Sequence, residues 1–245
     1  MISVCVATYN GSKYIKEQLI SILEQLGDND EIIISDNCSN DSTIEIINKI
    51  DDPRIKIFQI KPCSNVPHVA ITFNFENALK KAKGDFVYLS DQDDIWDKNK
   101  ISIFSKYFEE GYDLIVSDFC VFDKNIDINN RPFKGKSPFN NYLIFSPKYF
   151  GCCMAFNRYI KDCSLPFPKN LPLHDSWIGC LSEFVGNVKF INMPLTYRRI
   201  HDLNASENKH NKLLYKISYR LLFFISLLTR VCNVKYSRNG CKKNN

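Results

Sequence analysis

The sequence predicts an α/β fold in which an open, mostly parallel sheet is flanked by helices. Short apolar runs alternate with segments of helical spacing along the first 110 residues, and this alternation is typical of parallel strands joined by helical crossovers. Each early apolar run ends in a polar turn. The chain has 245 residues, of which 44% are hydrophobic, so it has enough apolar side chains for a sizeable core.

The individual elements follow from apolar periodicity. Ile2 to Ala7 is a β-rich apolar run, and Tyr14 to Leu26 carries apolar residues at helical spacing. The same strand and helix pattern recurs twice before Gly84 opens a fourth strand. The further predicted strands are 31–35, 55–60, 86–90, 113–122 and 149–156, and the further predicted helices are 43–50, 70–83, 101–110 and 175–185.

Charge divides the chain into a body and a tail. Nine of the 32 Lys and Arg residues lie between 208 and 245, where there is no Asp or Glu, so 23 basic residues remain against 27 acidic ones. A mildly acidic body argues against nucleic-acid binding. We predict one domain over 1–206 and a basic tail over 207–245. Lys212 to Val231 has the pattern of an amphipathic helix, which would lie on a membrane or pack against the body or a second subunit.

The expected location is the cytoplasm, with the tail at the inner membrane surface. Ile2 to Ala7 enters the first strand without the basic and long apolar regions of a secretory signal. The longest apolar segment, Leu221 to Leu228, is shorter than the roughly 20 residues that span a bilayer. The ten cysteines include no C-x-x-C pair, which favours reduced thiols.

Three polar turns follow the predicted strands. They are Thr8 to Gly11, Asp36 to Asp41 and Asp91 to Asp94. In an open parallel sheet, the carboxyl ends of the strands lie at one edge, and ligands bind beyond that edge. We therefore expect these three turns to meet there.

The last of these turns places three carboxylates within four residues. Carboxylates this close repel one another unless a cation lies between them, and oxygen ligands suit Mg²⁺ or Mn²⁺. The alternative is a solvated acidic turn with helix-capping Asp residues. In the second turn, Asp36 could accept hydrogen bonds from a nucleotide base, whereas Asp41 or Ser42 would cap the next helix. Thr8 to Gly11 is either a simple turn or a wall of a nucleotide pocket.

The order and spacing of these turns resemble those of the family 2 glycosyltransferases, which have the GT-A fold. The resemblance covers roughly Met1 to Ser206, and the form of Ser90 to Trp96 is similar to a rhamnosyltransferase-like branch of bacterial surface polysaccharide synthesis. It implies inverting transfer of a sugar from a nucleotide diphosphate sugar, such as dTDP-rhamnose or a UDP-sugar, to a hydroxyl of a saccharide or lipid-linked saccharide. Mn²⁺ or Mg²⁺ would be the cofactor. The alternatives are a nucleotidyltransferase and a non-catalytic nucleotide-sugar-binding module at the membrane.

The resemblance also implies roles for residues of the three turns. Asp36 would contact the base, Asp91 would lie near the ribose and the metal, and Asp93 would bind the metal directly. The family often has two consecutive acids where this chain has Asp36 and Asn37, so the role of Asn37 is open. The remaining residues of the predicted nucleotide-sugar site are Thr8, Tyr9, Asn10 and Gln92.

Further along the chain, Asp175 matches the position of the family's catalytic carboxylate. An inverting transferase needs a base that takes the proton of the acceptor hydroxyl. The alternative makes Asp175 a helix cap, with His174 on the surface. Other implied positions are Gly151 and Trp177 on the acceptor side, and Arg199 and His201 as contacts of the diphosphate or the metal.

Overall fold

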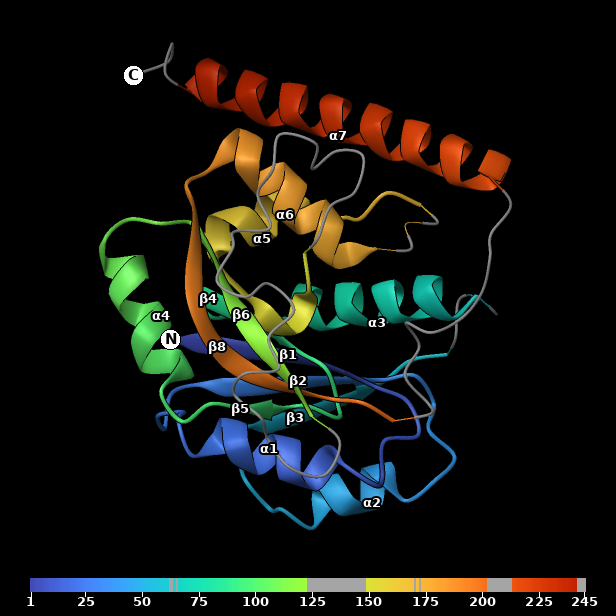
Figure 1. Ribbon diagram of the computed structural model, residues 1–245, viewed down its shortest axis with the longest axis vertical. Helices are drawn as coiled ribbons and strands as arrows, with labels where there is room; N and C mark the ends of the chain where they lie inside the picture. Colours follow the sequence, from blue (N-terminus) through green and yellow to red (C-terminus); the bar gives the residue numbers. More distant parts are fainter. Residues whose placement is uncertain are drawn as a thin grey trace.

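The computed structural model describes residues 1–61, 64, 66–122, 149–169, 171, 173–201 and 213–241. Within these residues, an eight-stranded sheet has the order β3-β2-β1-β4-β7-β6-β8-β5. Figure 1 shows the sheet at the centre of the molecule, between the helices. The strands are β1 (Ile2–Thr8), β2 (Glu31–Asp36), β3 (Ile55–Gln59), β4 (Phe86–Ser90), β5 (Ile95–Trp96), β6 (Leu114–Phe122), β7 (Met154–Asn157) and β8 (Val188–Arg199).

Most of the sheet is parallel, as predicted. β1 pairs in parallel with β2 and β4, β2 with β3, and β6 with β8. β7 is antiparallel to both of its neighbours, β4 and β6, and β5 is antiparallel to β8. Because β7 reverses the direction twice, β6 and β8 run the same way as β1. The carboxyl ends of β1, β2, β4, β6 and β8 therefore share one edge of the sheet.

Helices cover both faces of the sheet (Figure 1). The core on one face contains side chains of α1, α2 and α4, and the core on the other contains side chains of α3, α5, α6 and α7. The helices are α1 (Ile15–Leu23), α2 (Thr43–Asn48), α3 (Pro67–Lys81), α4 (Lys100–Glu109), α5 (Arg158–Ser164), α6 (His174–Val185) and α7 (Leu213–Cys241), with a 3-10 turn η1 (Gly151–Cys153).

Burial on both faces explains the continuous apolar runs of the central strands. In β1, Val4 and Val6 face the α1 side and Cys5 faces the α3 side, and all three are fully buried. A strand with one solvated face would instead alternate apolar and polar residues.

Three elements were not predicted from the sequence: β5, α5 and β8. In β8, Asn192 and Pro194 interrupt the apolar pattern, and the pairing with β6 shifts its register on both sides of Asp118. A strand can tolerate a proline at such an irregularity, where ladder hydrogen bonds are already missing. The strand predicted over 149–156 is wrong in its first half, which contains η1, and β7 follows.

The tail forms a helix, but it is longer than predicted and is part of the core. α7 continues to Cys241 rather than ending at Val231. Its residues Phe223, Leu227 and Val231 are buried in the same cluster as α6, so the described part of the tail packs on the body. The predicted domain boundary at 206/207 lies outside the described residues. Within the part of the chain that the structure describes, no helix has the length and apolar character of a membrane-spanning segment.

Candidate functional site

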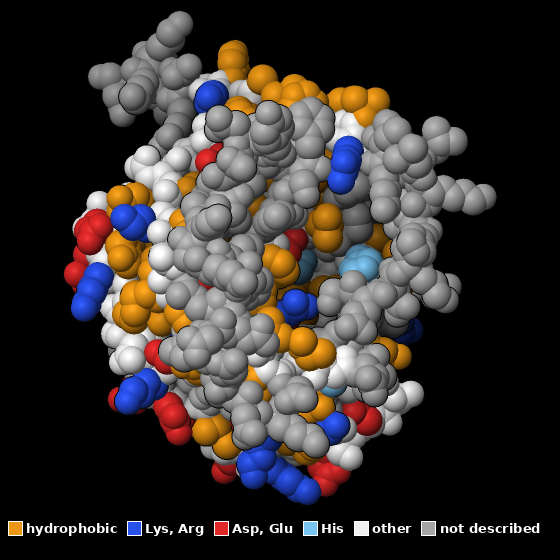
Figure 2. Space-filling model, viewed as in Figure 1, with side chains coloured by type: hydrophobic (Ala, Val, Ile, Leu, Met, Phe, Trp, Pro, Cys, Tyr) orange, Lys and Arg blue, Asp and Glu red, His pale blue; other side chains and the backbone are white. Residues whose placement is uncertain are grey.

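The three polar turns meet at the predicted edge of the sheet. Gln92 binds the backbone of Tyr9 twice: its Oε1 accepts from the amide at 2.9 Å, and its Nε2 donates to the carbonyl at 3.1 Å. The amide of Asn10 donates to Oγ of Ser39 at 2.8 Å. In the view of Figure 2, acidic, basic and histidine side chains surround a hollow near the centre of the molecule. The turns after β1, β2 and β4 thus form one unit.

Gly11 leaves the space that Gln92 occupies. A Cβ at Gly11 would lie 2.4 Å from Oε1 of Gln92, which is far inside van der Waals contact. We expect Gly11→Ala to displace this flexible side chain and break its link to Tyr9, so that the predicted nucleotide pocket binds a nucleoside diphosphate about fivefold more weakly, the equivalent of about 1 kcal/mol. Calorimetric titration with a set of nucleoside diphosphates measures the change.

Gly27→Ala is the matched control for this prediction, because the nearest atom to its added Cβ would be 3.6 Å away, at ordinary contact distance. Equal nucleoside diphosphate affinity in the Gly11→Ala and Gly27→Ala variants would show that the link between Gln92 and Tyr9 does not shape the predicted nucleotide pocket.

Asp36 organises the second turn from a buried position. Its carboxylate accepts hydrogen bonds from Oγ1 of Thr8 at 2.8 Å and from the amide and hydroxyl of Ser39 at 2.8 and 2.6 Å. Of the two residues predicted to cap the next helix, Ser42 is the cap of α2, without a side-chain cap hydrogen bond. Asp41 precedes it, and its Oδ1 accepts from the amide of Thr43 at 3.0 Å. A contact of Asp36 with a nucleotide base stays a prediction.

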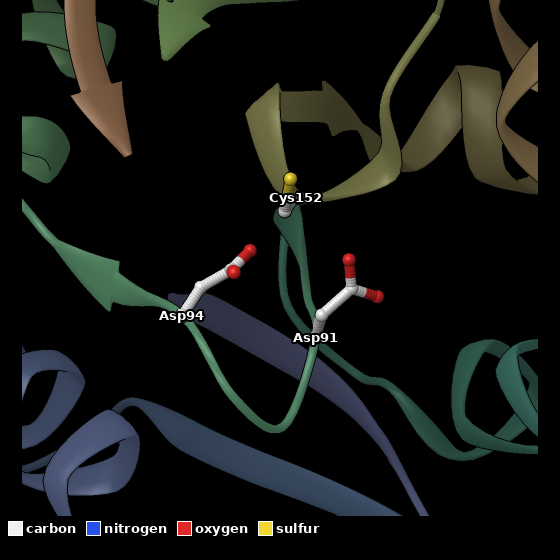
Figure 3. Close-up of side chains that lie close together, drawn as sticks. All are labelled: Asp91, Asp94 and Cys152. Atoms are coloured by element: carbon white, nitrogen blue, oxygen red, sulfur yellow. The ribbon is translucent and has the colours of Figure 1, made fainter. Parts of the chain in front are cut away.

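The acidic turn after β4 gathers two carboxylates opposite a thiol. Asp91 and Asp94 both point toward Cys152 of η1 (Figure 3), and one ligand atom of each of the three residues lies within 4.8 Å of the others. Asp94 is 2% exposed. Its Oδ1 accepts from the amide of Arg199 at 3.2 Å, whereas its Oδ2 has no hydrogen-bond partner among the described residues.

The electrostatics of this turn fit a divalent cation. Burial, and then the charge of Asp93, raise the pKa of Asp91 to about 7. Burial and the carboxylates of Asp91 and Asp93 raise the pKa of Asp94 well above its usual value. Crowded carboxylates with a buried, unpartnered oxygen match the ligands that Mg²⁺ and Mn²⁺ prefer. The pKa of Cys152 is also raised, by its neighbour Cys153 and by burial, so its thiol is neutral and a poor ligand for these ions.

The carboxylate of Asp93 lies next to His201, which follows β8. Its Oδ2 lies 2.7 Å from Nε2 of His201, and the ring of His201 lies 4.9 Å from that of Tyr14. The structure thus brings together Asp93 and His201, which are 108 positions apart in the sequence.

Arg199 and Arg198 face opposite sides of β8. Arg199 donates to Glu17 at 2.6 Å and to the carbonyl of Asp93 at 3.1 Å. Burial lowers the pKa of Arg198, but its neighbours Cys152, Asp91 and Asp94 outweigh this effect, so that its pKa is raised overall. Since neighbouring side chains of a strand alternate in direction, Arg198 rather than Arg199 is the arginine whose charge acts on the acidic pair, and no motif in the sequence indicated this role.

A second missed residue is Lys100, which is fully buried beneath the acidic turn. Its Nζ donates to the carbonyl of Cys152 at 2.6 Å and to Oγ1 of Thr196 at 2.8 Å, and it lies 4.3 Å from the centre of the Trp96 ring. Lys100 therefore joins α4, η1 and β8 and places a positive charge near Asp94.

Asp175 lies in the first turn of α6, partly buried beside η1. Burial raises the pKa of Asp175 to about 6, although hydrogen bonds from the backbone of Ser176 and Gly151 act in the opposite direction. The helix cap is Leu173 rather than Asp175. A carboxylate with this pKa is largely ionised near neutral pH and still basic enough to accept a proton.

One alternative from the sequence placed His174 on the surface, and the structure shows that this alternative is wrong. His174 is 8% exposed, its ring stacks on Phe75 at 4.2 Å, and burial lowers its pKa to about 3. A Cβ at Gly151 would lie 3.0 Å from Nε2 of His174 and 3.9 Å from Cβ of Asp175. The close approach that requires this glycine is therefore to α6, and a contact of Gly151 with the acceptor stays a prediction.

The acceptor-side role predicted for Trp177 is wrong. Trp177 is fully buried, and its indole Nε1 donates to the carbonyl of Ser164 at 3.0 Å. Residues two positions apart on a helix point about 200° apart, so Trp177 faces the core while Asp175 faces the site.

Comparison with known proteins gives consistent matches. The model of glycosyl transferase family 2 matches residues 3–163. WfaP of Escherichia coli, named UDP-Glc:alpha-D-GlcNAc-diphosphoundecaprenol beta-1,3-glucosyltransferase, is 28% identical over 99% of this chain and 95% of its own length. The dTDP-rhamnosyl transferase RfbG of Shigella flexneri is 39% identical over 39% of this chain and 34% of its own length.

Solved structures match the fold. TarS 1-349 of S. aureus in complex with UDP-GlcNAc has a TM-score of 0.73 at 20% identity, over 91% of this chain, which spans 65% of that structure. The mannosyltransferase PcManGT of Pyrobaculum calidifontis, in complex with GDP-Man and Mn²⁺, has a TM-score of 0.61 at 17% identity, over 98% of this chain and 75% of its own. The fold is therefore GT-A, and because the family model covers well over half of the chain, this protein belongs to glycosyl transferase family 2.

Proposed function

We propose that this glycosyltransferase moves a sugar, with inversion, from a nucleotide diphosphate donor to an acceptor hydroxyl. One observation carries the proposal: the Asp175 carboxylate lies near enough to the acidic turn for its charge to raise the pKa of Asp91. A base and a cluster of anionic ligands in one site match the needs of a single displacement. A nucleotidyltransferase and a non-catalytic module are not favoured by the family.

Asp91 and Asp93 would hold the cation, and His201 would orient the carboxylate of Asp93 from 2.7 Å. When bound, Mn²⁺ or Mg²⁺ would offset the negative charge of the leaving diphosphate as a Lewis acid. Arg198 would add a fixed positive charge beside it. The Asp175 carboxylate would take the proton of the acceptor hydroxyl while that oxygen bonds to the anomeric carbon and the bond to the diphosphate breaks.

The proposed donor carries a uracil base, as in UDP-sugars, or a thymine base, as in dTDP-rhamnose. These two bases present the same hydrogen-bonding groups. Oδ1 of Asn37 is shielded from solvent and has no hydrogen-bond partner within the described ranges. Such an oxygen suits the single N–H donor of these bases. Asn37, whose role the sequence left open, would then read the base from the turn that Asp36 supports.

The proposed acceptor is a saccharide or a lipid-linked saccharide of the cell envelope, reached by peripheral attachment to the membrane. The name of the E. coli relative gives a diphosphoundecaprenol-linked sugar as acceptor, and the basic tail described above is suited to an anionic membrane surface.

A panel of nucleotide sugars, incubated with and without Mn²⁺ or Mg²⁺, tests this function. Release of UDP or dTDP from one donor, dependent on the metal, is the expected result. Failure of every pyrimidine nucleotide sugar alongside turnover of a purine one would refute the assignment of the base, and metal-independent turnover would refute the role of the cation.

Metal binding should depend on pH because Asp91 must lose its proton to bind the cation. With the pKa of Asp91 raised to about 7, the carboxylate is ionised above pH 7 and protonated below it. We expect the affinity for Mn²⁺ to weaken up to about tenfold per pH unit below 7 and to level off above it. Titration at pH 5.5 to 8 measures this, and a flat affinity over that range would contradict it.

A further inference from the structure

The outward face of α7 is apolar. Leu222 and Ile225 are 65% and 51% exposed, and Tyr236 is 83% exposed. At 100° per residue, these positions and the exposed Leu221 and Leu228 fall on one side of the helix. In Figure 2, hydrophobic side chains gather along the upper edge, where Figure 1 places α7. These five residues form the outer face of α7.

The inner face of α7 is already occupied by the protein. Phe223, Leu227 and Val231 are buried, and Arg230 donates to the carbonyl oxygens of Cys163, Leu165 and Pro166 at 2.8, 3.1 and 2.6 Å. These contacts fix how the helix is rotated. The outer face therefore cannot turn inward, and apolar side chains gathered on a surface in this way are typical of an interaction site.

The charge around the outer face indicates what covers it. The stretch from 208 to 245 holds nine Lys or Arg and no Asp or Glu, and Arg220 and Lys235 are exposed near the two ends of the row. A second copy of the chain on this face would bring two strongly basic tails together, which like-charge repulsion disfavours. An apolar row with flanking cations instead fits an anionic lipid surface.

We propose that the outer face of α7 inserts into the interface of an anionic membrane and presents the active site to a lipid-linked acceptor. The rings of Phe223 and Trp177 meet edge to face, with centroids 6.0 Å apart, and Trp177 follows Asp175 by two residues on α6. Since a helix is about 10 Å across, the membrane surface lies about one helix width from the helix that carries the base. The choice of acceptor rests on the proposed function.

The test uses the whole 245-residue chain, because removing the tail would strip Phe223, Leu227 and Val231 from the core. Wild type is expected to sediment with phosphatidylglycerol vesicles far more than with phosphatidylcholine vesicles. The Leu222→Glu/Ile225→Glu double variant should lower this partition at least about tenfold. The matched control is Ile20→Glu/Met193→Glu, at sites 40% and 44% exposed on α1 and β8, which makes the same charge change and should leave the partition unchanged.

Three results would overturn the proposal: no sedimentation of wild type with phosphatidylglycerol vesicles, full binding by the Leu222→Glu/Ile225→Glu variant, or a wild-type dimer in size-exclusion chromatography that this variant dissociates. Donor hydrolysis without lipid, measured on every variant, separates this proposal from the catalytic one. Equal hydrolysis with lost vesicle binding is the expected outcome, whereas vesicle binding by a wild type that hydrolyses no donor would count against the proposed function alone.

Discussion

Asp175→Asn is expected to lower turnover by about 10²- to 10⁴-fold while leaving donor affinity nearly unchanged. The amide keeps the size of the side chain and its contacts with the backbone of Ser176, but it cannot accept the proton of the acceptor hydroxyl. At saturating Mn²⁺, the wild-type rate should rise with pH through about 6, where the carboxylate ionises. The variant should lose this dependence.

Asp162→Asn is the control, since it makes the same chemical change on an exposed side chain of α5. Steady-state rates over pH 5 to 8 and donor titrations on all three proteins provide the measurement. If the Asp175→Asn variant keeps both the wild-type rate and its acid limb, another group removes the proton.

Asp93→Ala is expected to lower metal-dependent turnover at least about 10³-fold, because a direct ligand of the cation supports several kcal/mol of charge stabilisation at the diphosphate. His201→Ala should cost only about 10- to 100-fold if the ring orients the carboxylate of Asp93 and does not bind the cation itself. Rates measured across a range of Mn²⁺ concentrations compare the two variants.

Asp28→Ala, which removes an exposed carboxylate remote in sequence from the acidic turn, is the control for Asp93→Ala. If His201→Ala lowers metal-dependent turnover as much as Asp93→Ala does, His201 is itself a ligand of the cation. If the Asp93→Ala variant stays active with wild-type metal dependence, the cation binds to Asp91 and Asp94 instead of Asp93.

The first half of the fold could be predicted from the sequence because its strands are buried on both faces. Such strands appear as unbroken apolar runs, so the ends at Thr8, Asp36 and Ser90 are visible, and the polar turns that follow must meet at one edge. β8 could not be predicted from the sequence because Asn192 and Pro194 interrupt its apolar pattern and its register with β6 is irregular.

Side-chain direction and burial account for the other differences. Spacing on a helix already separates Asp175 from Trp177, so the burial of Trp177 could have been predicted. The burial of Lys100 could not, because the groups that bind its ammonium come from Cys152 and Thr196, which are 52 and 96 positions away. The sequence likewise could not show that Oδ1 of Asn37 is buried without a hydrogen-bond partner among the described residues, because burial depends on the surrounding elements of the fold.

The buried ammonium of Lys100 has a consequence for how this protein matures. Three carboxylates in one turn would oppose compaction if nothing offset them, and many small metal sites assemble only when the ion arrives. Here Lys100 and Arg198 bring two positive charges to the acidic turn from the chain itself. We therefore expect the newly made polypeptide to reach its final shape without a cation, so that the proposed metal would bind to a site that is already formed.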